Sequence, residues 1–225
     1  MPSPSTLAPT TPPGDRHDWI TRMLLAASAI ASQNMLQGYA RDPHYAVRKA
    51  AAANPRLAAE SLSLLAQDPE AGVRIAAAGN IRTPAAVLDI LGRMPDWRIR
   101  VAVARHPNAS KACLAVLADD PELRVRMALA GNPSLPPELM RRLSRHEAWG
   151  IRAFVASNLH APADMLQILA GDPRWEVRMA TAANPNAPEK LLRLLIRDSD
   201  PRVRGALADN PELTPDKLRK LLSQH

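Results

Sequence analysis

The sequence contains few of the residues on which small proteins build cores and reactive sites. Aromatic residues make up 3% of the 225 residues, so large rings cannot form the core. The single cysteine, Cys113, excludes a disulfide framework or a thiolate cluster and is typical of a cytoplasmic protein. No hydrophobic run is long enough to cross a bilayer, so we expect no membrane span.

Signals for catalysis and for cofactors are missing as well. The six histidines are scattered without metal-ligand spacing, and neither a Ser/His/Asp set nor a glycine-rich phosphate loop occurs. One enzymatic alternative stays open, because helical-repeat DNA glycosylases also use Trp, Arg and Asp on a basic surface. Trp149, Trp175 and Asp172 could imitate that arrangement, although no motif matches. The sequence therefore favours a non-catalytic protein without a cofactor or metal.

Alanine, leucine and arginine, which are good helix formers, dominate the sequence. Hydrophobic residues account for 46% of the chain, and few stretches alternate with period two, which indicates an all-α protein. The 22 prolines fit such a protein only at the starts and ends of helices. The net charge of +7 favours an acidic partner or nucleic acid.

A Val/Ile-Arg pair recurs every twenty-six residues without insertion or deletion. Alanine stands four residues after each arginine, asparagine six after it in six of seven copies, and leucine or methionine at fourteen and leucine at seventeen. Seven copies at a fixed period predict an α-solenoid, in which each repeat packs on its neighbours. The repeated arginines are Arg48, Arg74, Arg100, Arg126, Arg152, Arg178 and Arg204.

The shared columns of the repeat predict two helices in each copy. An aspartate followed by proline is expected to cap the first helix, as at Asp42, Asp68, Asp120 and Asp172. That helix should run about eleven residues to an asparagine in the left-handed conformation, where a proline stops it. The second, shorter helix should carry the paired leucines and start at Pro84, Pro136, Pro162 and Pro188.

The repeat also divides the chain. We expect a disordered Pro/Ser/Thr-rich tail over residues 1–17, N-terminal capping helices over 18–41 and the seven-repeat solenoid over 42–225. The capping segment fits the frame in degraded form, since Arg22 lies one full period before Arg48.

The pattern D-P-x-x-x-V-R-x-A-x-A-x-N-P-x-x-P-x-x-L-L resembles the leucine-rich repeat variant of bacteria. It is best shown by DPRWEVRMATAANPNAPEKLLRLLI, which begins at Asp172. The resemblance implies a right-handed superhelix without a sheet, in which an α-helix alternates with a shorter, 3₁₀-like helix. Some members of the family carry a cysteine-rich iron–sulfur domain; with Cys113 alone, no cluster can be transferred to this chain.

The repeated arginine is interpreted as structural. It lies among apolar residues, where a guanidinium must be paired, and cap carboxylates of the same or the neighbouring repeat are the natural partners. Two repeats lack the aspartate: Met94 is followed by Asp96, and His146 by Glu147. Phosphate binding by this column is the alternative. We expect Arg126→Ala to cost several kcal/mol and an exposed Arg141→Ala under about 0.5 kcal/mol.

Two further sets of side chains are candidates for binding. An aromatic column three residues before the arginine, with neighbouring arginines, is typical either of surface packing or of a protein-binding stripe; its residues are Tyr45, Trp97, Arg98, Arg124, Trp149, Arg174 and Trp175. A basic row on the second helices is either a solvated face or a nucleic-acid contact; it comprises Arg93, Arg141, Arg145, Arg193, Arg197, Lys217, Arg219 and Lys220.

The hypothesis drawn from these patterns is a cytoplasmic repeat scaffold that binds another protein, with an acidic surface, through the aromatic column. Nucleic-acid binding through the basic row is the alternative.

Overall fold

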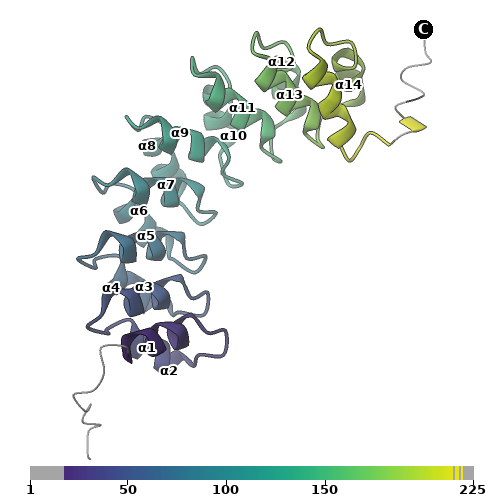
Figure 1. Cartoon of the computed structure of the whole chain (residues 1–225). Helices are drawn as coiled ribbons and strands as arrows, with labels where there is room; N and C mark the ends of the chain where they lie inside the picture. Colours follow the sequence, from purple (N-terminus) through teal and green to yellow (C-terminus); the bar gives the residue numbers. More distant parts are fainter. Residues whose placement is uncertain (1–17, 215, 218, 220–225) are drawn as a thin grey trace, which may run out of the picture. The chain divides into compact units, whose positions relative to one another are not determined.

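The structure, a computed structural model, describes residues 18–214, 216, 217 and 219. All regular secondary structure within these residues is helical, and short helices follow one another in pairs (Figure 1). The expected all-α solenoid class is confirmed. The expected tail over residues 1–17 and Lys220 lie outside the described residues.

The first helices of the pairs carry the alanine column, except α15, whose column alanine Ala208 lies in the turn that follows it. They are α1 (Asp18–Ala27), α3 (Tyr45–Ala53), α5 (Ala71–Gly79), α7 (Trp97–Arg105), α9 (Leu123–Ala130), α11 (Trp149–Ser157), α13 (Trp175–Ala183) and α15 (Pro201–Ala206). The second helices share the leucine columns. They are α2 (Gln33–Tyr39), α4 (Ala59–Leu65), α6 (Ala85–Leu91), α8 (Lys111–Leu117), α10 (Pro137–Leu143), α12 (Ala163–Leu169) and α14 (Glu189–Leu195). A 3₁₀ turn, η1 (Leu207–Asp209), follows α15.

The helices form two compact units, divided between Arg82 and Thr83. In the N-terminal unit, α3 packs between α1 and α5, while α2 and α4 pack beside the first helices. In the C-terminal unit the first helices pack in the order α7, α9, α11, α13 and α15, and each second helix contacts at least one of the first helices next to it in sequence (Figure 1).

The core of each unit is built from the columns that the repeat predicts. The alanine four residues after the arginine is completely buried in each copy from Ala52 to Ala182, which lets neighbouring first helices approach closely. The paired leucines of the second helices are buried as well, for example Leu62 and Leu65 in the N-terminal unit and Leu114 and Leu117 in the C-terminal unit.

The aspartates that were expected as caps, Asp42, Asp68, Asp120 and Asp172, do not cap the first helices. Helix α3 has His44 as its N-cap and α13 has Arg174, two residues after Asp42 and Asp172. The aspartate instead closes the turn before the helix: Asp172 Oδ1 accepts the Arg174 N–H at 2.9 Å. The first helix is correspondingly shorter than expected, with nine residues in α3, α5, α7, α11 and α13.

The repeated asparagines are not left-handed, contrary to the expectation from sequence. Asn54 has φ −71° and ψ 121°, an extended conformation, and Asn158 has φ −69° and ψ 124°. Their side-chain amides form hydrogen bonds to the backbone of the preceding repeat. The Asn158 Nδ2 donates to the carbonyls of Ala130 and Asn132, both at 3.0 Å, and its Oδ1 accepts the His160 N–H at 2.9 Å.

The same asparagine pattern holds along each unit. The Nδ2 atoms of Asn54, Asn80, Asn132, Asn184 and Asn210 each donate to carbonyls 26 and 28 residues earlier. These carbonyls lie at the end of the preceding first helix, where the last carbonyl oxygens have no N–H donor within the helix. The buried amide therefore satisfies the backbone of one repeat while it fixes the next.

The second helices also differ from the expected 3₁₀-like form. They are seven-residue α-helices, and hydrogen bonds four residues apart, such as Leu62 N–H to Ala58 O and Ala66 N–H to Leu62 O, support that assignment. Pro84, Pro136, Pro162 and Pro188 are the N-caps of their helices.

Replacing a column asparagine by its isosteric acid should break the bond between repeats. Asn158→Asp removes both Nδ2 donors and places a carboxylate against two carbonyl oxygens at a site that is 5% exposed. We expect a loss of about 3 kcal/mol or more in the free energy of unfolding, measured by urea denaturation. The exposed Asn34→Asp should change stability by less than about 0.5 kcal/mol. Similar losses for the two variants would contradict this function of the column.

Candidate functional site

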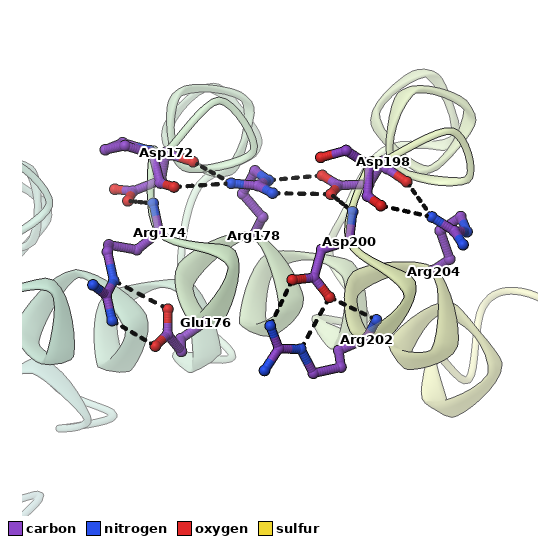
Figure 2. Close-up of polar contacts among 10 residues, drawn as sticks. Asp172, Arg174, Glu176, Arg178, Asp198, Asp200, Arg202 and Arg204 are labelled. Carbon is purple, nitrogen blue, oxygen red and sulfur yellow. Dashed lines mark hydrogen bonds and ion pairs between the residues drawn. The ribbon is translucent and has the colours of Figure 1, made fainter.

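The repeated arginines form a ladder of ion pairs between successive repeats. In each intact rung the guanidinium binds the aspartate twenty residues further on through two parallel hydrogen bonds. In Arg152, Nε lies 2.6 Å from Asp172 Oδ2 and Nη2 lies 2.9 Å from Asp172 Oδ1. The other rungs are Arg22–Asp42, Arg48–Asp68, Arg100–Asp120 and Arg178–Asp198. Figure 2 shows the Arg178 rung.

From Arg48 onward, each ladder arginine also fixes the turn before its own helix. Arg178 Nη1 donates to the carbonyls of Asp172 and Pro173 at 2.8 and 3.2 Å, while its Nε and Nη2 reach Asp198. Arg204 Nη1 contacts Asp198 O at 2.6 Å in the same way (Figure 2). One guanidinium therefore joins two consecutive turns. This requires arginine, because its planar group presents several N–H donors in fixed directions.

The electrostatics of the intact rungs favour the charged forms of both partners. Burial of Asp172 opposes its ionisation, but hydrogen bonds from Arg152 and from the Arg174 N–H, with the arginine charge, lower the pKa of this carboxyl below its ordinary value. The hydrogen bond with Asp172 also raises the pKa of Arg152. The Asp172 side chain is 6% exposed and that of Arg152 13%. These are buried, mutually satisfied charges.

Two rungs are incomplete. Among the described residues, the buried Nε atoms of Arg74 and Arg126 have no hydrogen-bond partner. His146 stands twenty residues after Arg126, and Met94 twenty residues after Arg74 in the sequence. Arg100 and Arg152 are fully paired although Met94 and His146 belong to their own repeats. The carboxylate partner thus comes from the following repeat, and the nearby acid Glu147 does not replace it at Arg126.

Because of this geometry, we expect the large loss in the free energy of unfolding for the alanine variant of Arg152 and not for that of Arg126. Arg152→Ala removes a bidentate pair and leaves the buried Asp172 carboxylate without its guanidinium, so we expect a loss of about 3–5 kcal/mol. Arg126→Ala removes a guanidinium that has no carboxylate partner and should cost clearly less. Urea denaturation of both variants, with the exposed Arg141→Ala as control, measures the difference. A loss for Arg126→Ala equal to that for Arg152→Ala would contradict the assignment.

His146 should make stability depend on pH. Burial and the charges of Arg126, Arg152 and Arg142 lower the pKa of its imidazole, while Glu147 opposes them. The unfolded chain, with an ordinary pKa near 6.5, therefore binds a proton at a higher pH than the folded chain does. Stability from this group is complete above about pH 6.5 and falls as the pH drops toward the lower folded pKa.

The variant His146→Asn tests this dependence, because it keeps a side chain that can accept the Ala148 N–H but cannot titrate. The unfolding midpoint of the wild type should fall more than that of His146→Asn between pH 7 and pH 5.5. Parallel pH profiles of the two proteins would show that His146 does not carry the effect.

The tryptophans of the C-terminal unit form a row in which each ring is covered by an arginine of the next repeat. The guanidinium carbon lies 4.8 Å from the ring centroid for Arg124 over Trp97, 5.3 Å for Arg174 over Trp149 and 3.4 Å for Arg202 over Trp175. These are cation–π distances. Trp149 remains 41% exposed, and Trp97 and Trp175 are partly buried. We call these six residues the tryptophan face.

Every arginine of the tryptophan face holds a carboxylate of its own repeat. Arg202 pairs with Asp200 at 2.7 Å and Arg174 with Glu176 at 2.7 Å (Figure 2), while Arg124 lies 3.9 Å from Glu122. The hydrogen bond from Arg202 lowers the pKa of Asp200 to about 2. Arg98, which precedes the row, pairs with Asp96 at 2.8 Å.

The order of acid and arginine is exchanged in one repeat without loss of the stacking. Glu122–Arg124 and Asp200–Arg202 place the acid first, whereas Arg174–Glu176 places it second. In all three cases the guanidinium lies over the tryptophan of the preceding repeat. The stacked arrangement is therefore a property of the surface and not of one residue position.

Tyr45 belongs to the N-terminal unit and is 51% exposed. Its ring stacks on His44 at 5.2 Å between centroids, and His44 stacks on Trp19 at 4.2 Å. Trp19 stands three residues before Arg22 and so continues the aromatic column into the capping helices, a position that sequence reasoning missed although the spacing revealed it. Arg202, which lies beside the aromatic column in the sequence, stacks on Trp175.

The basic row is only partly available for a partner. Arg193 pairs with Glu189 at 2.6 Å, Arg219 lies 3.3 Å from Asp216 and Lys217 lies 3.9 Å from Glu212. Arg93, Arg141, Arg145 and Arg197 are exposed.

Exposed aliphatic side chains on the second helices are a feature that sequence reasoning overlooked. They occupy one repeat position, sixteen residues after the ladder arginine, and lie off the face of the paired leucines. Ile90 is 58% exposed, Val116 55%, Ile168 55% and Leu194 61%, and Leu64 in the N-terminal unit 45%. We call the four in the C-terminal unit the aliphatic column. Leu194 and Lys190 line a groove of about 270 Å³ beside Gln167 and Gly171.

Reactive groups are few in the described part of the chain. Cys113 is buried, and burial, with the charge of Asp89, raises the pKa of its thiol to about 11, so it is protonated at neutral pH. No group of three or more His, Cys, Asp or Glu side chains in this part could hold a metal ion. None of the described helices combines the length and the apolarity needed to cross a membrane.

The fold and its ladders define an α-solenoid repeat protein. The family model described as leucine rich repeat variant matches residues 45–70 and 97–122. The repeats at these residues are therefore leucine-rich repeat variant repeats, and the resemblance noted in the sequence is confirmed. No curated protein matches the chain in sequence.

Solved structures agree with this class. The chain is similar to a structure described as a leucine-rich repeat variant with a novel repetitive protein structural motif, with 28% identity over 86% of this chain and 82% of that one, and a TM-score of 0.54. It also matches YibA of Escherichia coli (13% identity, 96% and 94% coverage, TM-score 0.46) and computationally designed armadillo repeat proteins for modular peptide recognition (16% identity, 87% and 94% coverage, TM-score 0.24). These last two similarities are too low to support a conclusion.

Proposed function

We propose that this protein is a non-catalytic cytoplasmic scaffold that binds another protein through the tryptophan face. The observation that carries the proposal is the row of tryptophans held in place by arginines of the next repeat. Tryptophan and arginine dominate the energetics of protein interfaces. Stacking orders both side chains before a partner arrives, so less conformational entropy is lost on binding.

The pairing of the arginines changes the expected partner. Arg98, Arg124, Arg174 and Arg202 each already contact a carboxylate, so this surface is balanced in charge. A partner need not be acidic; flat apolar and aromatic side chains that pack on Trp149 fit the face better. Binding of this kind should depend weakly on salt, because few counterions are released.

Protein binding is favoured over nucleic-acid binding by the second helices. The aliphatic column exposes apolar side chains among the cations of the basic row, and grouped apolar side chains are typical of protein contacts. Three cations of the row also lie beside carboxylates. A nucleic-acid interface would instead present unpaired cations along its length and lose affinity steeply with salt.

Removing the tryptophans should abolish capture of the partner. We expect the triple variant Trp97→Ala, Trp149→Ala, Trp175→Ala to lose at least about tenfold in affinity, since interface tryptophans carry about 2 kcal/mol or more each. Affinity purification from cell lysate at two salt concentrations, with and without nuclease, measures the effect.

Two controls make the experiment specific. Circular dichroism verifies that the triple variant is folded, and Tyr45→Ala changes the same column in the other unit, where capture should persist. Unchanged capture by a folded triple variant would exclude the tryptophan face. Capture that disappears with nuclease would instead favour the nucleic-acid alternative.

A further inference from the structure

The incomplete rung at Arg126 differs from the intact ones in a single side chain. Arg126 Nη1 donates to Asp120 O, as the other ladder arginines donate to their own turns, so the guanidinium is held in the same position. No carboxylate of the described residues lies against its Nε–Nη2 edge, and Nε is buried without an acceptor. In five other rungs this same edge binds a carboxylate.

His146 retains one of the two functions of the aspartate that it replaces. Its Nδ1 accepts the Ala148 N–H at 3.0 Å, just as Asp172 Oδ1 accepts the Arg174 N–H at 2.9 Å. A neutral imidazole that accepts through Nδ1 carries its proton on Nε2. The turn before α11 is therefore preserved, but the imidazole presents an N–H donor where aspartate presents a second acceptor oxygen.

The surroundings of this rung are electropositive. The charges of Arg126, Arg152 and Arg142 act on His146, against the single opposing charge of Glu147. Arg152 itself is neutralised by Asp172, and Arg142 by Asp119. Arg126 is thus the cation at this position that has no carboxylate. Both Arg126 and His146 are partly exposed, but Arg126 Nε is buried, so a ligand reaches this atom only when the side chains that cover it move.

We propose that the Arg126–His146 rung binds a carboxylate supplied from outside the chain. The carboxylate oxygens accept hydrogen bonds from Arg126 Nε and Nη2, in the bidentate geometry of the intact rungs, and the His146 Nε2–H is a further donor. The ligand is either a small organic acid or the side chain of an aspartate or glutamate. This site is independent of the tryptophan face.

Thermal unfolding of the full chain in sodium acetate, compared with sodium chloride at equal ionic strength, tests the site. At acetate about tenfold above its Kd, the midpoint of the wild type should rise about 3–6 °C more than in chloride. His146→Asp supplies the carboxylate internally, so it should have a higher midpoint in chloride and no gain specific to acetate. Asp172→Ala exposes the Arg152 edge and should gain from acetate as the wild type does.

Each outcome decides the proposal. Equal gains for the wild type and His146→Asp would overturn it, because acetate would then act elsewhere. A gain for Asp172→Ala without one for the wild type would also overturn the proposal, because it would mean that the imidazole blocks the Arg126 edge. The absence of a gain in all three proteins would overturn it as well. If Asp172→Ala does not fold, the comparison of wild type with His146→Asp still decides.

The two sources of the carboxylate are separated with blocked amino acids. N-acetylaspartate amide, compared with N-acetylasparagine amide, presents an acidic side chain without other charges. A gain with the aspartate derivative and not the asparagine one assigns the site to acidic side chains, whereas a gain with acetate alone assigns it to a small acid.

Discussion

The structure depends on polar bonds between repeats at one strict spacing. In each unit a buried asparagine amide reaches the carbonyls 26 and 28 residues earlier, and a buried arginine reaches the aspartate 20 residues later. Both interactions leave buried groups unsatisfied if the register shifts by one residue, and such groups are costly. This explains why the repeat keeps one period without insertion or deletion, while apolar packing alone would tolerate small changes of length.

The repeated columns allowed most of the fold to be predicted from the sequence, since each column follows from a simple rule of helix packing or of chain termination. The helix pairs, the alanine contact and the buried leucines are examples. The asparagine was misread because left-handed helix ends are the common reason for asparagine at this place. Its amide here is an interrepeat donor, and an acceptor that lies a whole repeat away in the sequence leaves no local signal.

The direction of the arginine ladder could not be read from the repeat. The residue six positions before an arginine and the residue twenty after it occupy the same column, so a perfect repeat cannot distinguish the two. The irregular copies resolve it: Arg152 is paired although His146 precedes it, and Arg126 lacks a carboxylate partner because His146 follows. Exceptions in a repeat therefore carry information that its regular copies lack.

The same distinction separates scaffold from function. Columns that serve the interior are nearly invariant from copy to copy, because each buried donor or acceptor must be matched in the next repeat. The tryptophan face and the aliphatic column vary, and the exchange of acid and arginine around Glu176 shows that the surface keeps an arrangement while its residues change positions. Substitutions outside the ladder adapt the surface to a partner. A substitution within the ladder, such as His146 in place of aspartate, leaves the buried Arg126 Nε without an acceptor, and an acceptor from outside the chain can satisfy it.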